Sequence, residues 1–440
     1  RYKDRPVTKD ECQQNRWKWD IPKNCITFAD SIIANKHSLT FFPQNRAETV
    51  FDYTVKKEGL DSVKTRLYNP IGERRMEGRI IAPDFNFSGI SYGTYASTDY
   101  KAYTFTQKKA RKCTVSVPLF TNFRASFQMP ETQRDIKAVK KHSENWWHDY
   151  WQRSWIKTSS PEMKEAVRNY ELFRFMLGCN AFGEWPTKFN GGLFTFDPVY
   201  EDASRPFTPD YRCWGGGTMT AQNQRLVYWP LLKSGDFDLL LSQLSTYLRM
   251  LPNATLRTKC YWGHEGASFC EQIENCGLPN PAEYGKHKPS EDMGNERNAW
   301  LEYQWDTALE FCQMAIDLEK FSGQKHPEYY PLIEQCIIFF DKHYRYLAKQ
   351  RGVKDADENG KLILYPSSGC ETFKMAYNPS SVIAALKTVS LNYFRQNGDS
   401  TFYKLYRSIP ELPIKDGMIQ PAIVWARVQN VETTQLYPVY

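Results

Sequence analysis

The 440-residue sequence lacks several features that would assign it to a class at once. No run of about eighteen apolar residues occurs, so no membrane-spanning helix is expected. There is no arginine-rich arm, and 57 basic residues are balanced by 50 acidic ones to a net charge of +7, which argues against a nucleic-acid partner. No paired C-x-x-C spacing occurs, so neither a zinc ion nor another cofactor is expected.

Cysteine, by contrast, is abundant. Eleven cysteines are many for a cytosolic chain of this length, and Cys12 and Cys25 are spaced for a local disulfide. The sequons at Asn86 and Asn253 are compatible with export. The chain opens on Arg1 without a methionine or a signal peptide, which indicates a processed or trimmed product. Together these features predict a secreted or periplasmic protein.

Aromatic residues are the second excess, at 15% of the chain with 13 Trp and 27 Tyr. Many of them will be core residues. Trp and Tyr also stack on the C–H faces of sugar rings while a polar edge remains for the hydroxyls. An oligosaccharide or polysaccharide is therefore the predicted partner, and the oligomeric state stays open.

The pattern along the chain changes near residue 135. Residues 1–135 are rich in short β-type runs separated by Gly, Pro and Asn, which predicts a β-sandwich-like domain. The strands expected there are Leu39–Phe42, Arg79–Ala82, Ala102–Thr106 and Cys113–Phe120. Residues 136–160 form an aromatic helical linker, and residues 161–440 are dominated by amphipathic helices.

Helices with apolar stripes at three- and four-residue spacing indicate paired helices arranged in a ring. We expect them at Pro161–Cys179, Gln222–Lys233, Phe237–Leu251, Glu296–Phe321, Pro327–Gln350, Pro379–Gln396 and Ser400–Ser408. The fold class predicted is therefore β plus α, a sandwich-like region followed by an (α/α)6 toroid. A plain helical bundle or a solenoid is the alternative, although no fixed repeat is visible. These helices are fewer than six hairpins require, so some are missed or the toroid is incomplete at the C-terminus.

Five polar, aromatic segments interrupt the helices. They are Gly183–Phe194, Arg212–Pro230, Tyr261–Glu274, Tyr365–Phe373 and Asn430–Tyr440. Glycoside hydrolysis needs one protonated carboxyl and a second carboxylate, and aromatic surroundings raise the pKa of the first. The glutamates available in these segments are Glu265, Glu271, Glu274, Glu371 and Glu432. Their spacing does not rank them, and a glutamate near a helix start, such as Glu371, also has a purely structural explanation.

In their order, these segments resemble the helical-toroid enzymes of glycoside hydrolase family 95, the α-L-fucosidases and α-L-galactosidases, and most of all uncharacterised relatives of that family. The resemblance covers about residues 140–440. It is carried by the segments WWHDYWQRSWI, KFNGG, GGGTMTAQNQRLVYWP, PSSGCE and NVETTQLYPVY. The third is similar to the family's N-I-N-x-Q-M-N-Y-W-P segment, and the fourth to its P-S-x-S-P-E-N segment.

The resemblance implies that Glu371 is the general acid. The family's paired asparagines are replaced by Thr218 and Thr220, and Gln222 and Asn223 are able to substitute in part. The family's aspartate base has no counterpart here.

We therefore expect an exo-acting, inverting glycoside hydrolase with Glu371 as the acid. The base is expected from a missing C-terminal segment, or else is Glu271 or Glu432. Two alternatives stay open: a carbohydrate-binding homologue without activity, and a polysaccharide lyase using His264 with Tyr261 or Tyr365. The residues expected to bind substrate are Trp214, Thr218, Thr220, Gln222, Asn223, Trp229, Trp262, His264, Glu265, Tyr365 and Asn378.

Overall fold

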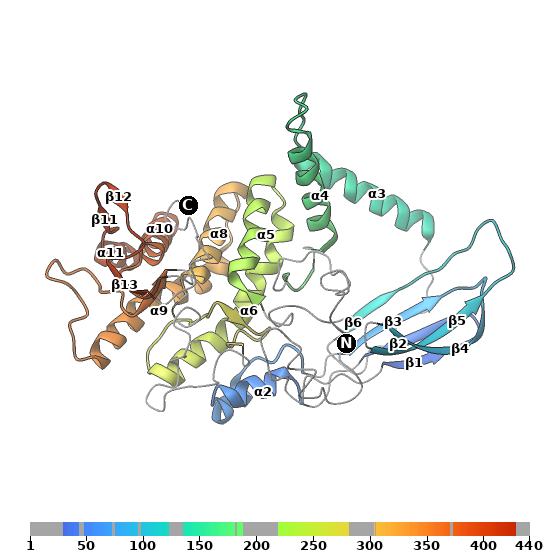
Figure 1. Ribbon diagram of the computed structural model, residues 1–440, viewed down its shortest axis with the longest axis horizontal. Helices are drawn as coiled ribbons and strands as arrows, with labels where there is room; N and C mark the ends of the chain where they lie inside the picture. Colours follow the sequence, from blue (N-terminus) through green and yellow to red (C-terminus); the bar gives the residue numbers. More distant parts are fainter. Residues whose placement is uncertain are drawn as a thin grey trace. The chain divides into compact units, whose positions relative to one another are not determined.

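The computed structural model describes residues 30–43, 48–72, 75–95, 98–122, 135–180, 183–187, 219–280, 303, 305–369 and 373–427. Two compact units emerge. The first comprises residues 1–53, 69–148 and 195–216, and the second comprises 54–68, 149–194 and 217–440. Along the chain a strand-rich region comes before a helix-rich region, as the colours of Figure 1 show, and this confirms the predicted order.

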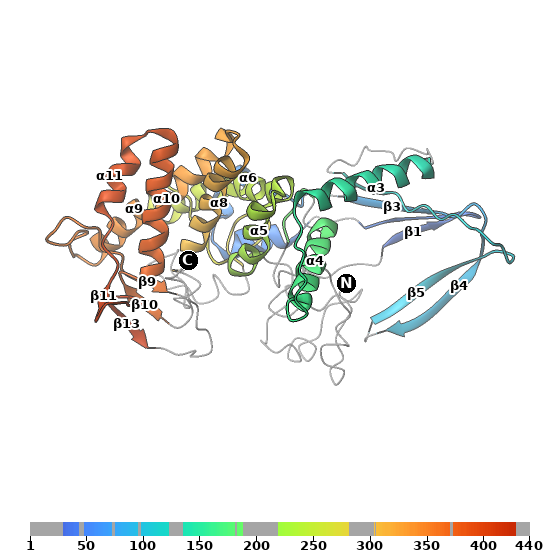
Figure 2. The ribbon, with the colours of Figure 1, turned by 90° about the horizontal axis from the view of Figure 1, so that it is seen from above.

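Antiparallel strands form the first unit. One sheet has the order β1-β2-β3-β6, and β4 pairs with β5 in a long hairpin, which Figure 2 shows as a ribbon of its own. The strands are β1 (Ser31–Ala34), β2 (Ser38–Phe42), β3 (Arg75–Ile81), β4 (Asn86–Tyr95), β5 (Thr98–Thr106) and β6 (Leu119–Asn122). A short helix, α2 (Val50–Lys57), follows β2, and Asp52 in its first turn accepts a hydrogen bond from the Thr49 amide.

Three of the four expected strands coincide with parts of β2, β3 and β5. Cys113–Phe120 was wrong over most of its length, because only Ser116 forms an isolated bridge, with Ile81, before β6 begins at Leu119. Within the sheet, Gly78 lies under the ring of Phe41 on the neighbouring strand. A Cβ at this position would lie 2.2 Å from the Phe41 ring, so a larger residue here would displace that ring.

Helices dominate the second unit, which also receives the C-terminal end of α3 (Ile136–Arg153). The others are α4 (Lys164–Asn180), α5 (Ala221–Ser234), α6 (Phe237–Trp262), α8 (Asp306–Ser322), α9 (Tyr330–Gln350), α10 (Ser380–Asn397) and α11 (Ser400–Ser408). Two 3-10 turns, η2 (Asp61–Arg66) and η6 (Pro327–Tyr329), also belong to this unit. Short strands lie between the helices: β7 (Met219–Thr220), β8 (Gln272–Ile273), β9 (Ser367–Gly369), β10 (Phe373–Tyr377), β11 (Ile414–Lys415), β12 (Met418–Ile419) and β13 (Val424–Arg427).

The predicted helices agree with the observed ones to within three residues, except at two boundaries. The sequence predicts a helix that ends at Leu251, yet α6 continues through Pro252 to Trp262. Packing outweighs the proline here, since the buried Asn253 side chain binds the backbone of Tyr68 and the carbonyl of Cys276. Burial also removes Asn253 from the surface where a glycan would be attached. The other boundary is the start of α8 at Asp306; the predicted start, Glu296, lies outside the described residues.

A buried ion pair holds α4 against the turn between α5 and α6. Arg174 of α4 donates from Nη2 to both carboxylate oxygens of Asp236, at 3.0 and 2.9 Å. The Ser234 hydroxyl donates to the same carboxylate at 2.5 Å. The guanidinium also packs 4.3 Å from the ring centroid of Tyr150. Both charged side chains are almost fully buried. Removing either one would therefore leave the other as a buried charge without a counter-charge.

None of the helices described is long and apolar enough to cross a membrane.

Candidate functional site

Two of the predicted loops meet at the start of α5. Thr220 of β7 pairs with Gln272 of β8, so the segment before α5 lies beside the segment after α6. Thr220 makes no side-chain cap at the helix start. Glu271 supplies this contact instead: its carbonyl accepts from the Ala221 amide at 3.0 Å and its Oε1 accepts from the Gln222 amide at 2.8 Å.

Glu271 is fully buried. Burial raises its pKa from 4.5 to about 8, against the opposing effects of the Gln222 amide, the Arg225 charge and the Thr307 hydroxyl. Its neighbour Asp306, the first residue of α8, is buried as well. Burial and then the charge of Glu310 raise the pKa of Asp306 to about 7. The carboxyl group of Glu271 is therefore mostly protonated at neutral pH, and that of Asp306 is about half protonated.

A third carboxyl group, that of Glu310, lies one turn further along α8 and is held by two donors from α5. Arg225 Nη1 donates to Oε1 at 2.6 Å, and Trp229 Nε1 donates to Oε2 at 2.9 Å. Arg225 and Trp229 are four residues apart and so project from one face of α5. This contact fixes the orientation of the Trp229 indole, which is only partly buried. We call Glu271, Asp306 and Glu310 with Arg225 and Trp229 the carboxyl cluster.

The sequence analysis found Glu271 and Trp229 but missed Asp306, Glu310 and Arg225. Asp306 and Glu310 are one turn apart, beside the predicted stripe that contains Thr307 and Phe311. That spacing was the available signal. Acidic residues next to an apolar stripe normally face solvent, and only the packing of α5 on α8 brings these two against Arg225.

The segment from Tyr365 to Ser381 is joined to the same region. Tyr344 of α9 donates to Ser367 of β9 at 2.8 Å, and the Ser381 side chain at the start of α10 lowers the pKa of Asp306, against the larger effect of burial. Tyr365 is half-buried, and the guanidinium of Arg351 lies over its ring, 5.0 Å from the ring centroid of Tyr365.

Asn378 has a structural partner rather than a free amide. It adopts a φ of 52°, and its Oδ1 accepts from the Leu364 amide at 2.8 Å. The backbone N–H of Asn378 in turn donates to the backbone carbonyl of Leu364. These two bonds hold the turn that leads from β10 into α10.

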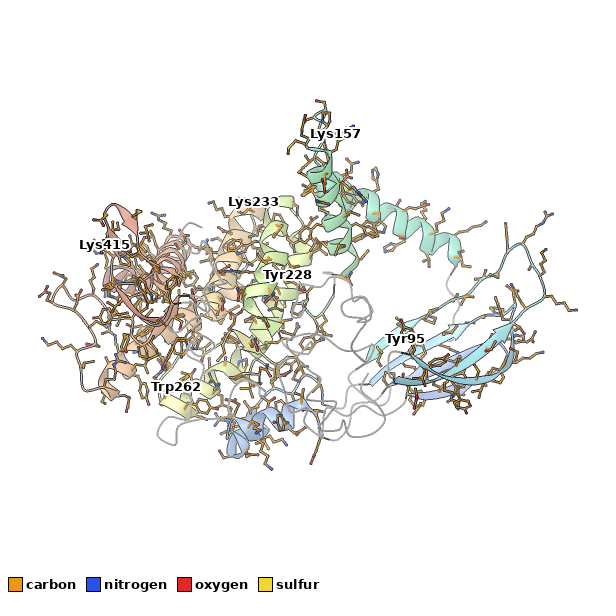
Figure 3. The ribbon with its side chains drawn as sticks, viewed as in Figure 1. Tyr95, Lys157, Tyr228, Lys233, Trp262 and Lys415 are labelled. Atoms are coloured by element: carbon orange, nitrogen blue, oxygen red, sulfur yellow. The ribbon has the colours of Figure 1, made fainter. Side chains whose placement is uncertain are left out.

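The other predicted group, around His264, is an aromatic cluster. Trp262, at the C-terminal end of α6 in Figure 3, is buried and lies parallel to the His264 ring at a centroid distance of 6.0 Å. His264 Nδ1 donates to the Glu265 carbonyl, and its Nε2 lies 3.0 Å from His343 Nδ1. Burial lowers the pKa of His264, and it lowers the pKa of His343 well below the usual value. Both rings are therefore neutral at physiological pH.

A close backbone contact fixes the loop after His264. Gly266 has a φ of +106°, and a Cβ there would lie 2.3 Å from the Phe339 Cα of α9. The loop that carries Glu271 is therefore pressed against α9, and glycine is required at this position.

Of the other predicted residues, Thr220 is buried, Gln222 and Asn223 are partly exposed, and Glu265 is exposed. Glu371, Glu432, Trp214 and Thr218 lie outside the described residues. Across the ranges that the structure describes, no three His, Cys, Asp or Glu side chains are arranged to hold a metal ion.

Replacing Glu271 by glutamine keeps the neutral shape and the acceptor for the Gln222 amide. Between pH 4.5 and 8 the native wild type binds more protons than the unfolded chain, so its stability falls as pH rises, by about 1.4 kcal/mol per pH unit for one such group. The variant lacks this titration. We therefore expect the free energy of unfolding of Glu271→Gln, relative to that of the wild type, to rise by about 2 kcal/mol from pH 5 to pH 7, as measured by urea unfolding.

Glu319→Gln is the matched control for this titration. Burial raises the pKa of Glu319, but hydrogen bonds from the His326 amide, Gln396 and Lys325 outweigh it, and the pKa is lowered overall. This variant should not gain stability over the same pH range. The difference in stability between Glu271→Gln and the wild type should change with pH. If it is the same at pH 5 and pH 7, the carboxyl group of Glu271 is not protonated in the folded protein as described.

Comparison with known proteins gives two findings. Residues 1–156 match a domain of unknown function, DUF5703. The match covers less than half of the 440-residue chain. No curated protein matches the chain. A solved structure described as a putative kojibiose phosphorylase from the human microbiome is similar, with a TM-score of 0.53 and 10% identity over 89% of this chain. The match spans only 48% of that protein, so this chain covers about half of its length.

At this identity the likeness shows the fold alone. It confirms the predicted architecture, a strand-rich region followed by a helical toroid. The likeness fits helical-toroid glycoside enzymes in general and does not single out family 95.

Proposed function

We propose that the chain is a carbohydrate-active enzyme that cleaves a glycosidic bond at the carboxyl cluster. The observation that carries this proposal is the meeting of three carboxyl groups with a fixed, partly exposed tryptophan, Trp229, in a helical-toroid fold. Glycosidases combine carboxyl groups of unlike pKa with aromatic surfaces for the sugar. In this proposal the cluster supplies the aromatic surface of Trp229 and carboxyl groups of raised pKa, and the acid and the base come from other glutamates.

The proton donor in this proposal is Glu371. It lies in the sequence between β9 and β10, which pair through Gly369 and Phe373. The segments on both sides of it, at Ser367 and Ser381, contact Tyr344 and Asp306 respectively. Glu271 is less suited as the donor, since it has no exposed surface and its Oε1 is bound to the start of α5. A general acid must reach the glycosidic oxygen.

Glu271 is also poorly suited as the base, because a group with a pKa of about 8 holds its proton at neutral pH. Of the two bases expected from the sequence we therefore favour Glu432. Glu271, and Asp306 in part, hold their protons at neutral pH, so in this proposal they add little negative charge to the site.

The first turns of α5 are the proposed sugar-binding surface. Gln222 and Asn223 are partly exposed there, and Trp229 follows two turns later with its N–H fixed by Glu310. Trp214 and Thr218 of the same segment complete the proposed surface. The substrate is an oligosaccharide or polysaccharide attacked at its end, with inversion.

Phosphorolysis is a second candidate, favoured by the fold shared with a protein described as a phosphorylase. The test is an assay of the purified chain on a panel of oligosaccharides and aryl glycosides, with and without inorganic phosphate. A free sugar formed without phosphate supports hydrolysis, and a sugar phosphate formed only with phosphate supports phosphorolysis.

The same panel can contradict the proposal. An unsaturated, ultraviolet-absorbing product would show a lyase instead. Sugar binding without any product, on a panel that also covers the bound glycan, would show a binding homologue. If the chain hydrolyses or phosphorolyses a substrate of the panel, Trp229→Ala should raise KM by up to about tenfold, because an aromatic contact contributes roughly 0.5–1.5 kcal/mol. An unchanged KM would place the sugar elsewhere.

A further inference from the structure

Arg351, which directly follows α9, places a positive charge at the surface of the helical unit. Its guanidinium lies over the ring of Tyr365, 5.0 Å from the centroid. Six residues earlier, Arg345 binds the carboxylates of Asp341 and Asp355. Among the described residues no carboxylate pairs with Arg351 in this way. The ionisable groups close enough to Arg351 to raise its pKa are instead tyrosines, namely Tyr365, Tyr303, Tyr377 and Tyr344.

Two of these tyrosines form a pair of rings. The centroids of Tyr365 and Tyr377 lie 5.8 Å apart, and the ring planes are inclined by 34°. Both side chains are half-buried, and neither phenol hydroxyl forms a hydrogen bond with another described residue. The guanidinium of Arg351 and the two hydroxyls are therefore hydrogen-bond donors that no described residue uses.

We propose that Arg351, Tyr365 and Tyr377 bind an oxyanion, either the carboxylate of a uronic acid residue in the substrate or inorganic phosphate. A guanidinium presents a planar set of N–H donors that fits the oxygen atoms of both groups. The phenol hydroxyls supply further donors, and the contact with the Tyr365 ring holds the guanidinium in place. The assignment rests on the proposed function, which makes the substrate a glycan.

The position of Arg351 links this site to the carboxyl cluster. Arg351 follows Tyr344 by seven residues, about two helical turns, so both lie on the same side of α9. Tyr344 donates to Ser367, which is two residues after Tyr365. Burial is the main cause of the raised pKa of Tyr344, and the charges of Asp306 and Arg351 shift that pKa in opposite directions. Tyr344 therefore lies near both the oxyanion site and the carboxyl cluster.

The charge of Arg351 favours an anionic ligand over a neutral one. Partial burial lowers the pKa of Arg351, because water solvates its charge less well than that of a fully exposed arginine. A bound anion would supply the counter-charge that no described residue provides. A neutral sugar offers only hydroxyl groups, whose hydrogen bonds with a guanidinium are weaker than those of a carboxylate or a phosphate.

The test is isothermal titration calorimetry of the full chain with inorganic phosphate, glucuronate and neutral glucose. We expect phosphate or glucuronate to bind more tightly than glucose, and the tighter of the two anions identifies the source of the oxyanion. Arg351→Gln removes the charge and should weaken the binding of that anion by about tenfold or more. Tyr365→Phe and Tyr377→Phe each remove one hydroxyl and should each weaken it about threefold.

Arg345→Gln is the matched control, because Arg345 lies on the same helix and its guanidinium is already paired with two aspartates. This variant should bind the anion as the wild type does. Circular dichroism checks that each variant is folded. If Arg351→Gln does not fold, the two phenylalanine variants decide.

Two results would overturn the oxyanion site. One is that neither anion binds more tightly than glucose. The other is that the anion binds equally well to the wild type and to the folded variants of Arg351, Tyr365 and Tyr377. These outcomes are separate from those of the proposed function. Turnover of neutral glycans without anion binding contradicts the oxyanion site alone, and anion binding that depends on Arg351, without any product from the panel, contradicts the enzymatic function alone.

Discussion

Replacing Glu371 by glutamine is expected to lower turnover of a glycan substrate by about 10²–10⁴-fold, the usual loss when a general acid is removed. The neutral amide cannot give a proton to the leaving oxygen, while its size and its hydrogen-bonding oxygen are retained. Substrate affinity should therefore change little. The measurement is kcat and KM of the purified variant on the best substrate of the panel.

Two control variants test whether the loss of turnover is specific to Glu371. Glu358→Gln changes an exposed carboxyl in the preceding loop and should leave kcat unchanged. Glu271→Gln should retain turnover within about tenfold of the wild type, because the carboxyl it replaces is already neutral. If Glu271→Gln loses as much turnover as Glu371→Gln, the donor has been assigned to the wrong glutamate.

Replacing Asp236 by alanine is expected to destabilise the helical unit by about 3–5 kcal/mol. The change leaves the buried guanidinium of Arg174 without its counter-charge and removes the acceptor of the Ser234 hydroxyl. Tyr150 keeps its cation–π contact with Arg174 but cannot replace a carboxylate. Urea unfolding followed by circular dichroism measures the loss.

The neighbouring exposed pair provides the control. Arg153 donates to Asp238 at 2.6 Å, but both side chains are about one-third exposed. Asp238→Asn should therefore cost no more than about 1 kcal/mol. The double variant Arg174→Met with Asp236→Leu removes both buried charges and should recover most of the stability. Equal effects of Asp236→Ala and Asp238→Asn would contradict the role of burial.

Much of the fold was predictable because local patterns determine it. The helix predicted at Ser400–Ser408 has the observed bounds, since Asp399 caps it through the Thr401 amide. The strand predicted at Cys113–Phe120 failed for the opposite reason. Alternating residues indicate a strand, but pairing depends on a partner strand. On the side of β3 away from β2, regular pairing begins only with β6 at Leu119–Asn122.

The candidate site was predictable only in part. Glu271 was identified because it lies in an aromatic loop, whereas Asp306 and Glu310 looked like ordinary residues of a surface helix. Their one-turn spacing places them on one face of the helix, but their contact with α5 depends on how the two helices pack. The same holds for the protonated state of Glu271, which results from complete burial and not from its sequence neighbours.

The dependence of turnover on the leaving group tests the central claim most directly. A substrate with a dinitrophenyl leaving group needs no protonation, whereas a sugar leaving group does. The account predicts that Glu371→Gln is about 10²–10⁴-fold slower than wild type on the sugar substrate and within about tenfold of it on the dinitrophenyl glycoside. Equal losses on the two substrates, or normal turnover of the sugar substrate, would contradict Glu371 as the proton donor.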